Sequence, residues 1–377
     1  MDFNLTPDQI AFKKMAQELV AKEITPYIRE MDEKGEMRPG LIQKFHEAGI
    51  LNLVVPEEYD GPGLDALSIA LIYEELGKGC AGIATSAAAN ALASYPVVVA
   101  GTEEQKRKMF DVINDGKLAA FALTEPNAGS DAGGVSTSAT KDGDYYVLNG
   151  TKCFITNGGI SDIYTVFANA RKSAGIRGLT AFIVDRNTPG FSVGKKEDKM
   201  GMRPSNTTEL VLDNVRVHAS MRIGREGEGF KIAMKTLDAA RPLVGAVGVG
   251  LADAALQAAC KYAKERQQFG KPIASFQMVQ GMIADMAMAV ETARLMVYKA
   301  CWLKDQGQEY KLESAMAKCL AADVAMKVTT DAVQIMGGYG YMREYPVEKM
   351  MRDAKLLQIY EGTNQIQRLV IANSILY

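Results

Sequence analysis

The sequence has few of the side chains on which most hydrolytic and metal-dependent sites are built. Its 377 residues include only two histidines, His46 and His218. A Ser-His-Asp triad or a histidine-ligated metal therefore has almost nothing to be assembled from. The five cysteines are scattered and form no C-x-x-C pair, which disfavours both a zinc site and a disulfide framework. Such a pattern is typical of reduced thiols in the cytoplasm.

The chain also lacks a strong charge of either sign. A net charge of −2 gives no attraction to nucleic acid or to an anionic membrane. The longest weakly polar run, residues 242–260, holds Asp253 and is rich in Gly and Ala, which favours a close-packed core helix over a membrane span. The first residues show no signal-peptide pattern. We therefore expect a soluble, cytoplasmic protein without membrane insertion.

The residue pattern of the chain changes twice, from helical to β-rich and back to helical, and this predicts three domains. Residues 1–116 are typical of helices, with capping boxes at Thr6 to Gln9 and at Thr102 to Gln105. Residues 117–228 consist of short β-rich runs between Gly, Asn, Asp and Pro turns. Residues 229–377 return to helical periodicity, with the spacing of an antiparallel bundle. Its four predicted stretches are 229–266, 275–306, 312–337 and 347–375. We predict an α+β, mainly α, fold whose domain junctions are suited to a ligand.

Two segments at the start of the β-rich domain could bind a flat, polar ligand. LTEPNAGSD, residues 123–131, can form a tight loop whose N–H groups and hydroxyls face a ring edge. FITNGG, residues 154–159, places an aromatic ring and a threonine beside two glycines. A structural turn and an ordinary hairpin explain the two segments equally well when each is taken alone.

Two helix breaks carry glycines that would allow close backbone approach to a phosphate. They are ERQQFGKPI, residues 265–273, and QIMGGYG, residues 334–340. Neither matches a G-x-G-x-x-G motif after a strand, so a Rossmann site is disfavoured.

A single acid occurs in the C-terminal stretch QIYEGTNQIQ, residues 358–367. Glu361 lies between an aromatic residue and Gly362, and hydroxyl and amide side chains follow it. These neighbours suit a polar ligand, but a solvated glutamate on a helix surface is the ordinary alternative.

Together these segments resemble the acyl-CoA dehydrogenase family of FAD flavoproteins. Seven segments, spread in order over the chain, carry the resemblance: LTEPNAGSD, KCFITNGG, DKMGMRPSNTTEL, ERQQFGKPI, DAVQIMGGYGY, EYPVEKMMRDAK and IYEGTNQIQ. The family fold is an N-terminal helical domain, a middle β-barrel and a C-terminal four-helix bundle. It implies domains 1–116, 117–228 and 229–377, the same division that the pattern of the sequence predicts.

The resemblance implies a role for each matching residue. Glu361 would remove the α-proton of an acyl-CoA thioester while hydride leaves for flavin N5, and its backbone N–H would help to polarise the thioester carbonyl. Phe154 would shield the flavin, although many relatives have Trp there, and Thr156 would donate to its N5 edge. The other residues implied to bind FAD are Phe121, Leu123, Thr124, Gly129, Ser130, Thr363 and Gln365, and, across a subunit interface, Arg266, Phe269, Gln277, Gln334, Gly337 and Gly338. The residues implied to meet the substrate are Ser130, Asp238, Arg241, Tyr360 and Gly362.

The resemblance also implies the partners of the protein. Family members of this length are usually homotetramers that pass electrons to an electron-transfer flavoprotein. A base in IYEGT is typical of enzymes for short- and medium-chain acyl groups, and Tyr95 could cap the acyl pocket formed by residues 85–96. KKEDKMGM and MDFNLT are similar to bacterial butyryl-CoA dehydrogenases, whereas DAARPLV and IQRLVIA are similar to medium-chain enzymes. Three alternatives stay open: an enoyl-CoA reductase of the same fold, an acyl-CoA oxidase, and a non-catalytic helical scaffold.

Overall fold

Six helices form the N-terminal part of the protein, in a computed structural model that describes residues 4–377. Thr6 and Thr102 cap the first and last of them, and both capping boxes are complete, which confirms the predicted helix starts. The helices are α1 (Pro7–Leu19), α2 (Ile28–Lys34), α3 (Leu41–Glu47), α4 (Ala66–Gly79), α5 (Ala81–Ala100) and α6 (Glu103–Asn114).

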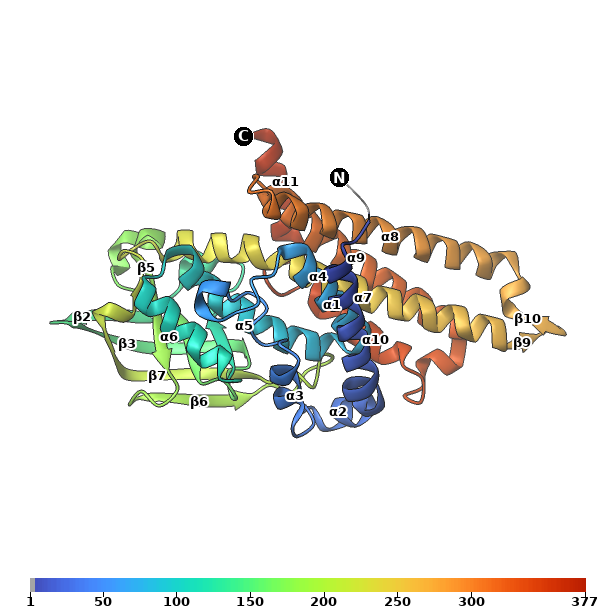
Figure 1. The fold of residues 1–377 in the computed structure, drawn as a ribbon, viewed down its shortest axis with the longest axis horizontal. Coiled ribbons are helices and arrows are strands. Elements are labelled where there is room, and N and C mark those ends of the chain that lie inside the picture. The colour runs from blue at the N-terminus through green and yellow to red at the C-terminus, as the bar shows by residue number, and fades with distance from the viewer. Residues whose placement is uncertain (1–3) are drawn as a thin grey trace.

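The middle part is a β-sheet with the strand order β6-β7-β3-β2-β4-β5-β8, in which β1 pairs with β4 in parallel. The sheet lies at one end of the molecule, on the left in Figure 1. Thr165 of β4 donates to the carbonyl of Ala93, so α5 lies directly against the sheet. The strands are β1 (Ala119–Ala122), β2 (Ser138–Asp142), β3 (Tyr145–Thr156), β4 (Ile163–Asn169), β5 (Leu179–Asp185), β6 (Phe191–Lys196), β7 (Thr207–His218) and β8 (Arg222–Ile223).

The C-terminal part is again helical, and its fourth predicted stretch is interrupted. The structure has two helices where residues 347–375 predict one, because the chain between them turns through left-handed conformations at Glu361 and Gly362. The elements are α7 (Gly229–Glu265), α8 (Gln277–Asp305), α9 (Lys311–Met336), α10 (Val347–Leu357) and α11 (Asn364–Leu376). A small hairpin, β9 (Gln267–Gln268) and β10 (Lys271–Pro272), joins α7 to α8. The predicted boundaries after residues 116 and 228 fall between α6 and β1 and directly before α7.

Helix α7 runs through the centre of the molecule and contains residues 242–260 (Figure 1). A Cβ on Gly250 would lie 1.9 Å from the carbonyl oxygen of Glu74, so α4 and α7 cross at backbone contact. Asp253 is paired with Lys78 of α4 at 2.8 Å. By length and composition α5 and α7 are both apolar enough to cross a membrane, but most of each is buried inside the protein. This agrees with the core helix predicted for residues 242–260.

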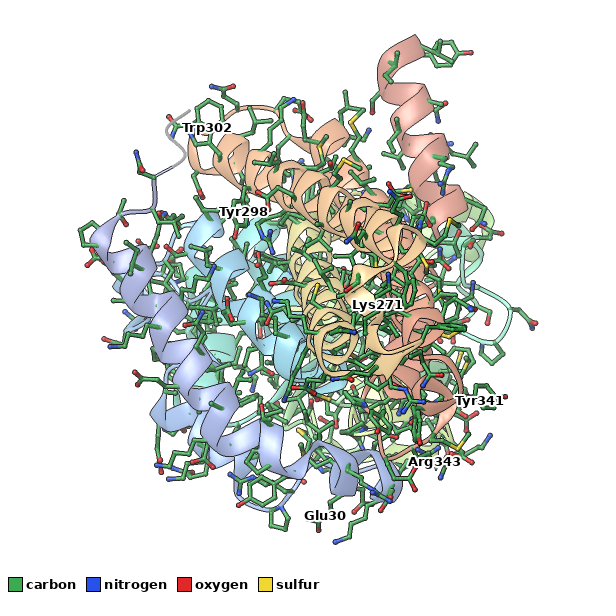
Figure 2. All side chains as sticks on the ribbon, turned by 90° about the vertical axis from the view of Figure 1, so that its right-hand side faces the viewer. Glu30, Lys271, Tyr298, Trp302, Tyr341 and Arg343 are labelled. Atoms are coloured by element: carbon green, nitrogen blue, oxygen red, sulfur yellow. The ribbon has the colours of Figure 1, made fainter. Side chains whose placement is uncertain are left out.

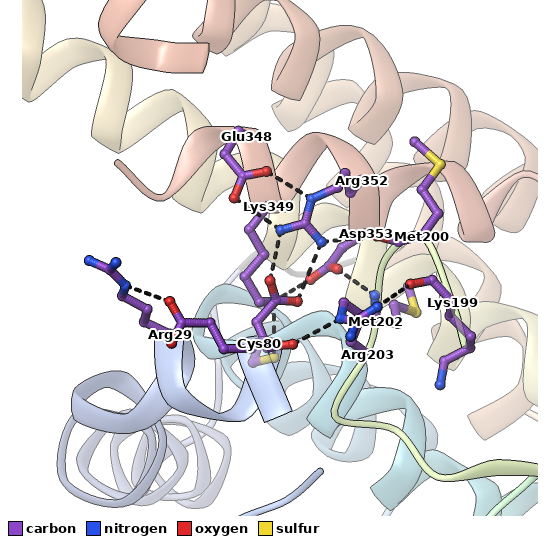
Figure 3. A network of polar contacts seen from close by, with 12 residues as sticks. Arg29, Cys80, Lys199, Met200, Met202, Arg203, Glu348, Lys349, Arg352 and Asp353 are labelled. Carbon is purple, nitrogen blue, oxygen red and sulfur yellow. Dashed lines mark hydrogen bonds and ion pairs between the residues drawn. The ribbon is translucent and has the colours of Figure 1, made fainter. Parts of the chain in front are cut away.

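A buried polar network joins all three parts at the start of α10 (Figure 3). Lys349 is paired with Asp353 and donates to the sulfur of Cys80 at 3.3 Å. Asp353 accepts the backbone N–H of Met202 in the DKMGMRPS segment. Arg352 donates to the carbonyl of Met200 at 2.9 Å. The network fixes α10, and with it the turn that follows, against the helical N-terminal part and the loop between β6 and β7.

Candidate active site

The turn after α10 presents Glu361 in a conformation that L-residues rarely adopt. Its φ angle is +52° and that of Gly362 is +88°. A Cβ at position 362 would lie 2.5 Å from Nε2 of Gln367, so glycine is required both by the backbone angle and by the close amide. Strain of this kind is typical of functional sites, where surrounding contacts hold an unfavourable backbone.

The Oε2 atom of Glu361 is buried and has no hydrogen-bond partner in the described part of the chain, although the residue as a whole is half-buried. Within residues 4–377, no donor reaches its Oε2 atom, and the Nε atom of the buried Arg241 is also unpartnered. Burial raises the pKa of Glu361 to about 7, although the positive charges of Lys318 and Arg241 lower it. An unpartnered carboxylate with a pKa near neutrality is suited to accept a proton.

Three hydrogen-bonding side chains hold this turn against α9. Lys318, which is fully buried, donates to the carbonyl of Gly362 at 2.8 Å and to Oδ1 of Asn364 at 3.0 Å. Gln367 donates to the carbonyls of Glu361 and Gly362 at 3.2 and 2.9 Å. The Asn364 amide donates to the carbonyl of Cys319 at 3.0 Å. The backbone of the acid is therefore fixed from two helices.

Helix α5 brings the acid close to the middle part of the protein. Tyr360 lies 3.2 Å from the hydroxyl of Thr85. The next residue on α5, Ser86, donates to Asn157, whose amide donates back to the Ser86 carbonyl at 2.8 Å. Because Asn157 directly follows Thr156, the QIYEGT and FITN segments converge on one turn of α5.

A buried ion pair fixes the LTEPNAGSD loop against β3. Lys152 is fully buried and donates to Glu125 at 2.7 Å and to the carbonyl of Leu123 at 3.0 Å. Burial disfavours the charged form of Glu125, but Lys152 and the donors of Ser136 and Thr137 outweigh it and lower the pKa to about 2. The loop backbone and the strand that carries Phe154 are thereby held in one arrangement.

The surface next to this pair has the features that a flavin ring requires. Phe154 lies at a register shift between β3 and β7, with a φ of +57° and a side chain that is 64% exposed. Gly129 and Ser130 are exposed on the loop, and a Cβ on Gly129 would have free space within 4 Å of it in the described chain. An aromatic ring held outward by a bulge, beside an open backbone, fits a stacked planar group.

The remaining predicted FAD residues on the sheet, on its loop and at the start of α11 differ in their burial. Phe121 packs on Phe167 with ring centroids 5.0 Å apart. The Leu123 side chain is buried, whereas Thr124 and Thr156 are partly exposed. Gln365 is exposed on the first turn of α11, and the Thr363 hydroxyl caps that helix by accepting the N–H of Ile366 at 3.2 Å.

A second set of predicted FAD residues lies at the opposite end of the molecule from the sheet (Figure 1). Arg266 stacks on Tyr339 and lines a cavity of about 500 Å³ together with Gly337 and Gly338. Phe269 is 92% exposed at the tip of the β9–β10 hairpin. Figure 2 views this end, with Lys271 of the hairpin near the centre and Tyr341 and Arg343 towards the edge. Gln277 and Gln334 are also exposed on this end of the bundle. The single chain therefore does not bring these residues to Phe154.

The two predicted substrate residues on α7 form a buried ion pair. Arg241 donates to Asp238 at 2.6 Å, and the Asp238 carbonyl accepts the hydroxyl of Ser314 at 2.6 Å. Burial lowers the pKa of Arg241 and raises that of Asp238. The charge of Arg241 acts on Glu361, so this pair borders the acid.

Sequence reasoning missed the side chains that hold the site together: Lys318, Asn364, Gln367, Lys152, Glu125 and Asn157. A signal for Lys318 exists in SAMAKCLAAD, where one lysine stands among small residues on the buried side of a helix. Lys152, Glu125 and Asn157 lie inside the motifs already singled out, but only the fold shows that they contact one another.

A helical part, a β-sheet and a helical bundle, with an unpartnered carboxylate oxygen in the turn of Glu361 and an outward aromatic ring on the sheet, fit a flavin-dependent oxidoreductase. Family models describe the same three parts as the acyl-CoA dehydrogenase N-terminal domain at residues 6–117, middle domain at 120–215 and C-terminal domain at 227–376. The chain belongs to the acyl-CoA dehydrogenase family, FAD-dependent enzymes that act on CH–CH bonds, and the predicted fold class, activity and cofactor are confirmed.

Individual relatives match over the whole chain. A short-chain-specific acyl-CoA dehydrogenase of Megasphaera elsdenii is 50% identical, with 100% of both chains covered. A solved structure from work on the electron transferring flavoprotein of Acidaminococcus fermentans is 51% identical with a TM-score of 0.98 and 100% of both chains covered. An acryloyl-CoA reductase (NADH) of Anaerotignum propionicum is 44% identical over 100% of this chain and 96% of its own length.

Proposed function

We propose that Glu361 is the base of a short- to medium-chain acyl-CoA dehydrogenase and removes the α-proton of the thioester. The observation that carries this assignment is the buried, unpartnered Oε2 atom of a carboxyl whose pKa burial raises to about 7. An ordinary glutamate with a pKa near 4.3 would be a weaker base. Exclusion of water by the bound substrate would raise the pKa further.

The residues around the base prepare the thioester for this step. The backbone N–H of Glu361 donates to the thioester carbonyl, where negative charge develops as the α-proton leaves. Asp238 and Arg241 border the acyl-CoA, and Tyr360 and Gly362 line the acyl end near the base. Ser130 meets the pantetheine arm from the exposed loop of the middle part.

Bound FAD would supply the hydride acceptor for the β-hydrogen at its N5 atom. The outward ring of Phe154 would shield one face of the flavin, and Thr156 would donate to its edge. The backbone of the LTEPNAGSD loop would line the rest, with Phe121, Leu123, Thr124 and Gly129. Thr363 and Gln365, which follow the base closely in the sequence, would meet the ADP part of FAD.

The fixed position of Tyr95 supports a short acyl chain. Tyr95 is buried on α5, and its hydroxyl accepts from Lys304 at 3.3 Å, so it is held in place where the pocket would deepen. The Megasphaera relative is named as short-chain specific, which supports the same range. We propose acyl chains at the short end of the short- to medium-chain class.

We further propose a cytoplasmic homotetramer that passes electrons to an electron-transfer flavoprotein. The Acidaminococcus structure supports such a flavoprotein as partner. The position of Arg266 and Phe269, far from Phe154 in one chain, supports an FAD site shared between subunits. The five cysteines are free, as expected for a reducing compartment.

A second candidate function of the same site is the reduction of an enoyl-CoA, and the similarity to an acryloyl-CoA reductase supports it. In that direction the protonated Glu361 returns a proton to the α-carbon, and the residues keep their places. Comparing initial rates with acyl-CoA and with enoyl-CoA plus reduced electron-transfer flavoprotein separates the two directions.

The decisive experiment uses the purified holoenzyme and acyl-CoAs of four to twelve carbons without oxygen. We expect loss of the oxidised flavin absorbance with the shorter chains. Glu361→Gln should bind the acyl-CoA but react at least about 10²-fold more slowly, whereas the exposed control Glu58→Gln, outside every predicted site segment, should react normally. Normal reaction of Glu361→Gln would show that the base is misassigned. A colourless protein that cannot be reconstituted with FAD would support the non-catalytic scaffold instead, and rapid reaction of the reduced enzyme with oxygen would support an oxidase.

A further inference from the structure

Two cations, Lys318 and Arg241, act on the base. In the described part of the chain, the hydrogen bonds of Lys318 go only to neutral oxygens, whereas Arg241 is paired with a carboxylate. The Lys318 ammonium donates to the carbonyl of Gly362 and to the side-chain oxygen of Asn364. Arg241, the other cation that acts on Glu361, is already paired with Asp238 at 2.6 Å. The charge of Lys318 is therefore the less neutralised of the two.

The contact to Gly362 fixes the backbone of the base itself. Glu361 and Gly362 are both held at positive φ, a conformation that the chain would leave if its carbonyl were free. The Gly362 carbonyl accepts from both Lys318 and Gln367, so the Gly362–Thr363 peptide, one residue beyond the base, is clamped from α9 and α11 together. A shift of this peptide would move the carboxylate and the Glu361 N–H at once.

A buried ammonium destabilises the folded state unless hydrogen bonds or an opposite charge compensate for the loss of its hydration. Burial lowers the pKa of Lys318 to about 8, and the nearby Glu361 carboxylate opposes that effect. The influence is mutual, since Lys318 is the larger of the two cationic effects that lower the pKa of Glu361. The other titratable or charged groups that interact with Glu361 or Lys318 are Arg241 on α7, Tyr73 on α4, Tyr95 on α5, Tyr360 in the turn, and Cys319 and Asp323 on α9, and Asp238 is paired with Arg241.

We propose that Lys318 is a positioning residue for the base: its ammonium holds the Gly362 carbonyl, and so the left-handed turn of Glu361 and Gly362, and its positive charge stabilises the ionised carboxylate. This inference rests on the proposed role of Glu361 as the base.

The test compares Lys318→Met with Lys327→Met in the FAD-loaded enzyme. Lys327 lies on the same helix but is exposed and paired with Asp331, so it controls for loss of a lysine on α9. The limb of the kcat/KM profile that rises with pH should move upward by about 1 pH unit in Lys318→Met, because a base that has lost one of its two neighbouring cations ionises at higher pH. At the high-pH plateau of the profile, displacement of Glu361 in Lys318→Met should lower kcat by about 10-fold or more. Lys327→Met should keep the wild-type profile.

Lys318→Gln, which can still donate to one oxygen without a charge, is used if Lys318→Met does not fold. It should recover part of the plateau rate but keep the displaced limb. A rising limb at the wild-type pH in a folded, flavin-containing Lys318 variant would overturn the inference.

An infrared titration gives a readout independent of turnover. The difference between each protein and its Glu361→Gln counterpart isolates the carboxylate band of Glu361. This band should titrate at higher pH in Lys318→Met than in the wild type. If the wild type dehydrogenates no acyl-CoA, the proposed function fails, while the infrared titration still decides whether Lys318 controls the ionisation of Glu361.

Discussion

Glu361 shows how one residue can be placed for chemistry at the expense of stability. Its carboxyl is buried with an unpartnered oxygen, and a buried polar group without a partner is destabilising in the folded state. The same burial makes the group a base near neutral pH. Stability and proton transfer therefore make opposite demands on this side chain.

This conflict predicts a pH-dependent gain in stability for Glu361→Gln. The pKa of Glu361 is raised to about 7 in the folded protein, above its ordinary value. The protonated Glu361 side chain therefore stabilises the folded protein at pH values below the pKa of the unfolded chain, and this stabilisation is lost as the pH rises through about 7. The variant should be more stable than the wild type at pH 8, by about 1–3 kcal/mol, and should gain much less at pH 5. Thermal unfolding at both pH values measures this, and equal gains at the two pH values, or a gain in the control Glu58→Gln, would contradict it.

Gly362 is a second residue whose identity is set by geometry. Gly362→Ala places a Cβ at a φ of +88° and 2.5 Å from Nε2 of Gln367. We expect a loss of about 1–2 kcal/mol in the free energy of unfolding from the backbone conformation alone, together with reduced activity. Gly281→Ala in α8 is the matched control, since its Cβ has free space within 4 Å among the described residues. Denaturant unfolding should show the control unchanged or slightly stabilised, and equal effects at both glycines would contradict the argument.

At the scale of elements, the loop before β2 and strand β3 depend on one buried ion pair. Lys152→Met leaves Glu125 charged and buried, with Ser136 and Thr137 as its remaining donors. We expect a loss of about 3–5 kcal/mol in the free energy of unfolding. The double variant Lys152→Met/Glu125→Gln should be less destabilised than Lys152→Met alone, because no unpaired charge remains. Lys14→Met, which breaks an exposed pair with Glu18 on α1, should cost less than about 1 kcal/mol. A double variant as unstable as the single one would show that the charge is not the cause.

The elements also show how far sequence reasoning reaches. Helix starts at Thr6 and Thr102 follow from local capping chemistry, so the sequence alone predicts them. The break at Glu361 does not, because QIYEGTNQIQ is compatible with a continuous helix until Lys318 and Gln367 hold its carbonyls. Local pattern determines where a helix begins, whereas a strained turn is stabilised by contacts from residues distant in the sequence.

The candidate site divides in the same way. Glu361, Phe154 and the LTEPNAGSD loop are found through motifs whose residue types suit the chemistry. The side chains that position them are ordinary lysines, asparagines and glutamines, and their role depends on which helix lies opposite. The convergence of Tyr360 and Asn157 on neighbouring residues of α5 is visible only when the domains are packed together.

At the scale of the whole molecule, the separation of Phe154 from Arg266 makes a prediction about subunit sharing. If each complete site combines the base of one subunit with the cavity around Arg266 of another, two different inactive variants can complement each other. Glu361→Gln supplies an intact cavity without a base, and Arg266→Ala supplies a base with a damaged cavity. In randomly mixed pairs, half of the pairs are mixed and one of their two sites is complete, so about a quarter of the wild-type activity should return.

The experiment co-expresses the two variants with different affinity tags and measures acyl-CoA dehydrogenation after each purification step. Each variant expressed alone should be nearly inactive, and selection through both tags should enrich mixed oligomers and raise the activity towards half of the wild-type value. Co-expression of Glu361→Gln with Lys318→Met is the control, because both changes lie in the same half of the site. In the mixed pairs of this control every site has a base that is absent or displaced, so no activity should be recovered. Mixed oligomers of Glu361→Gln and Arg266→Ala without recovered activity would show that each chain builds its FAD site alone.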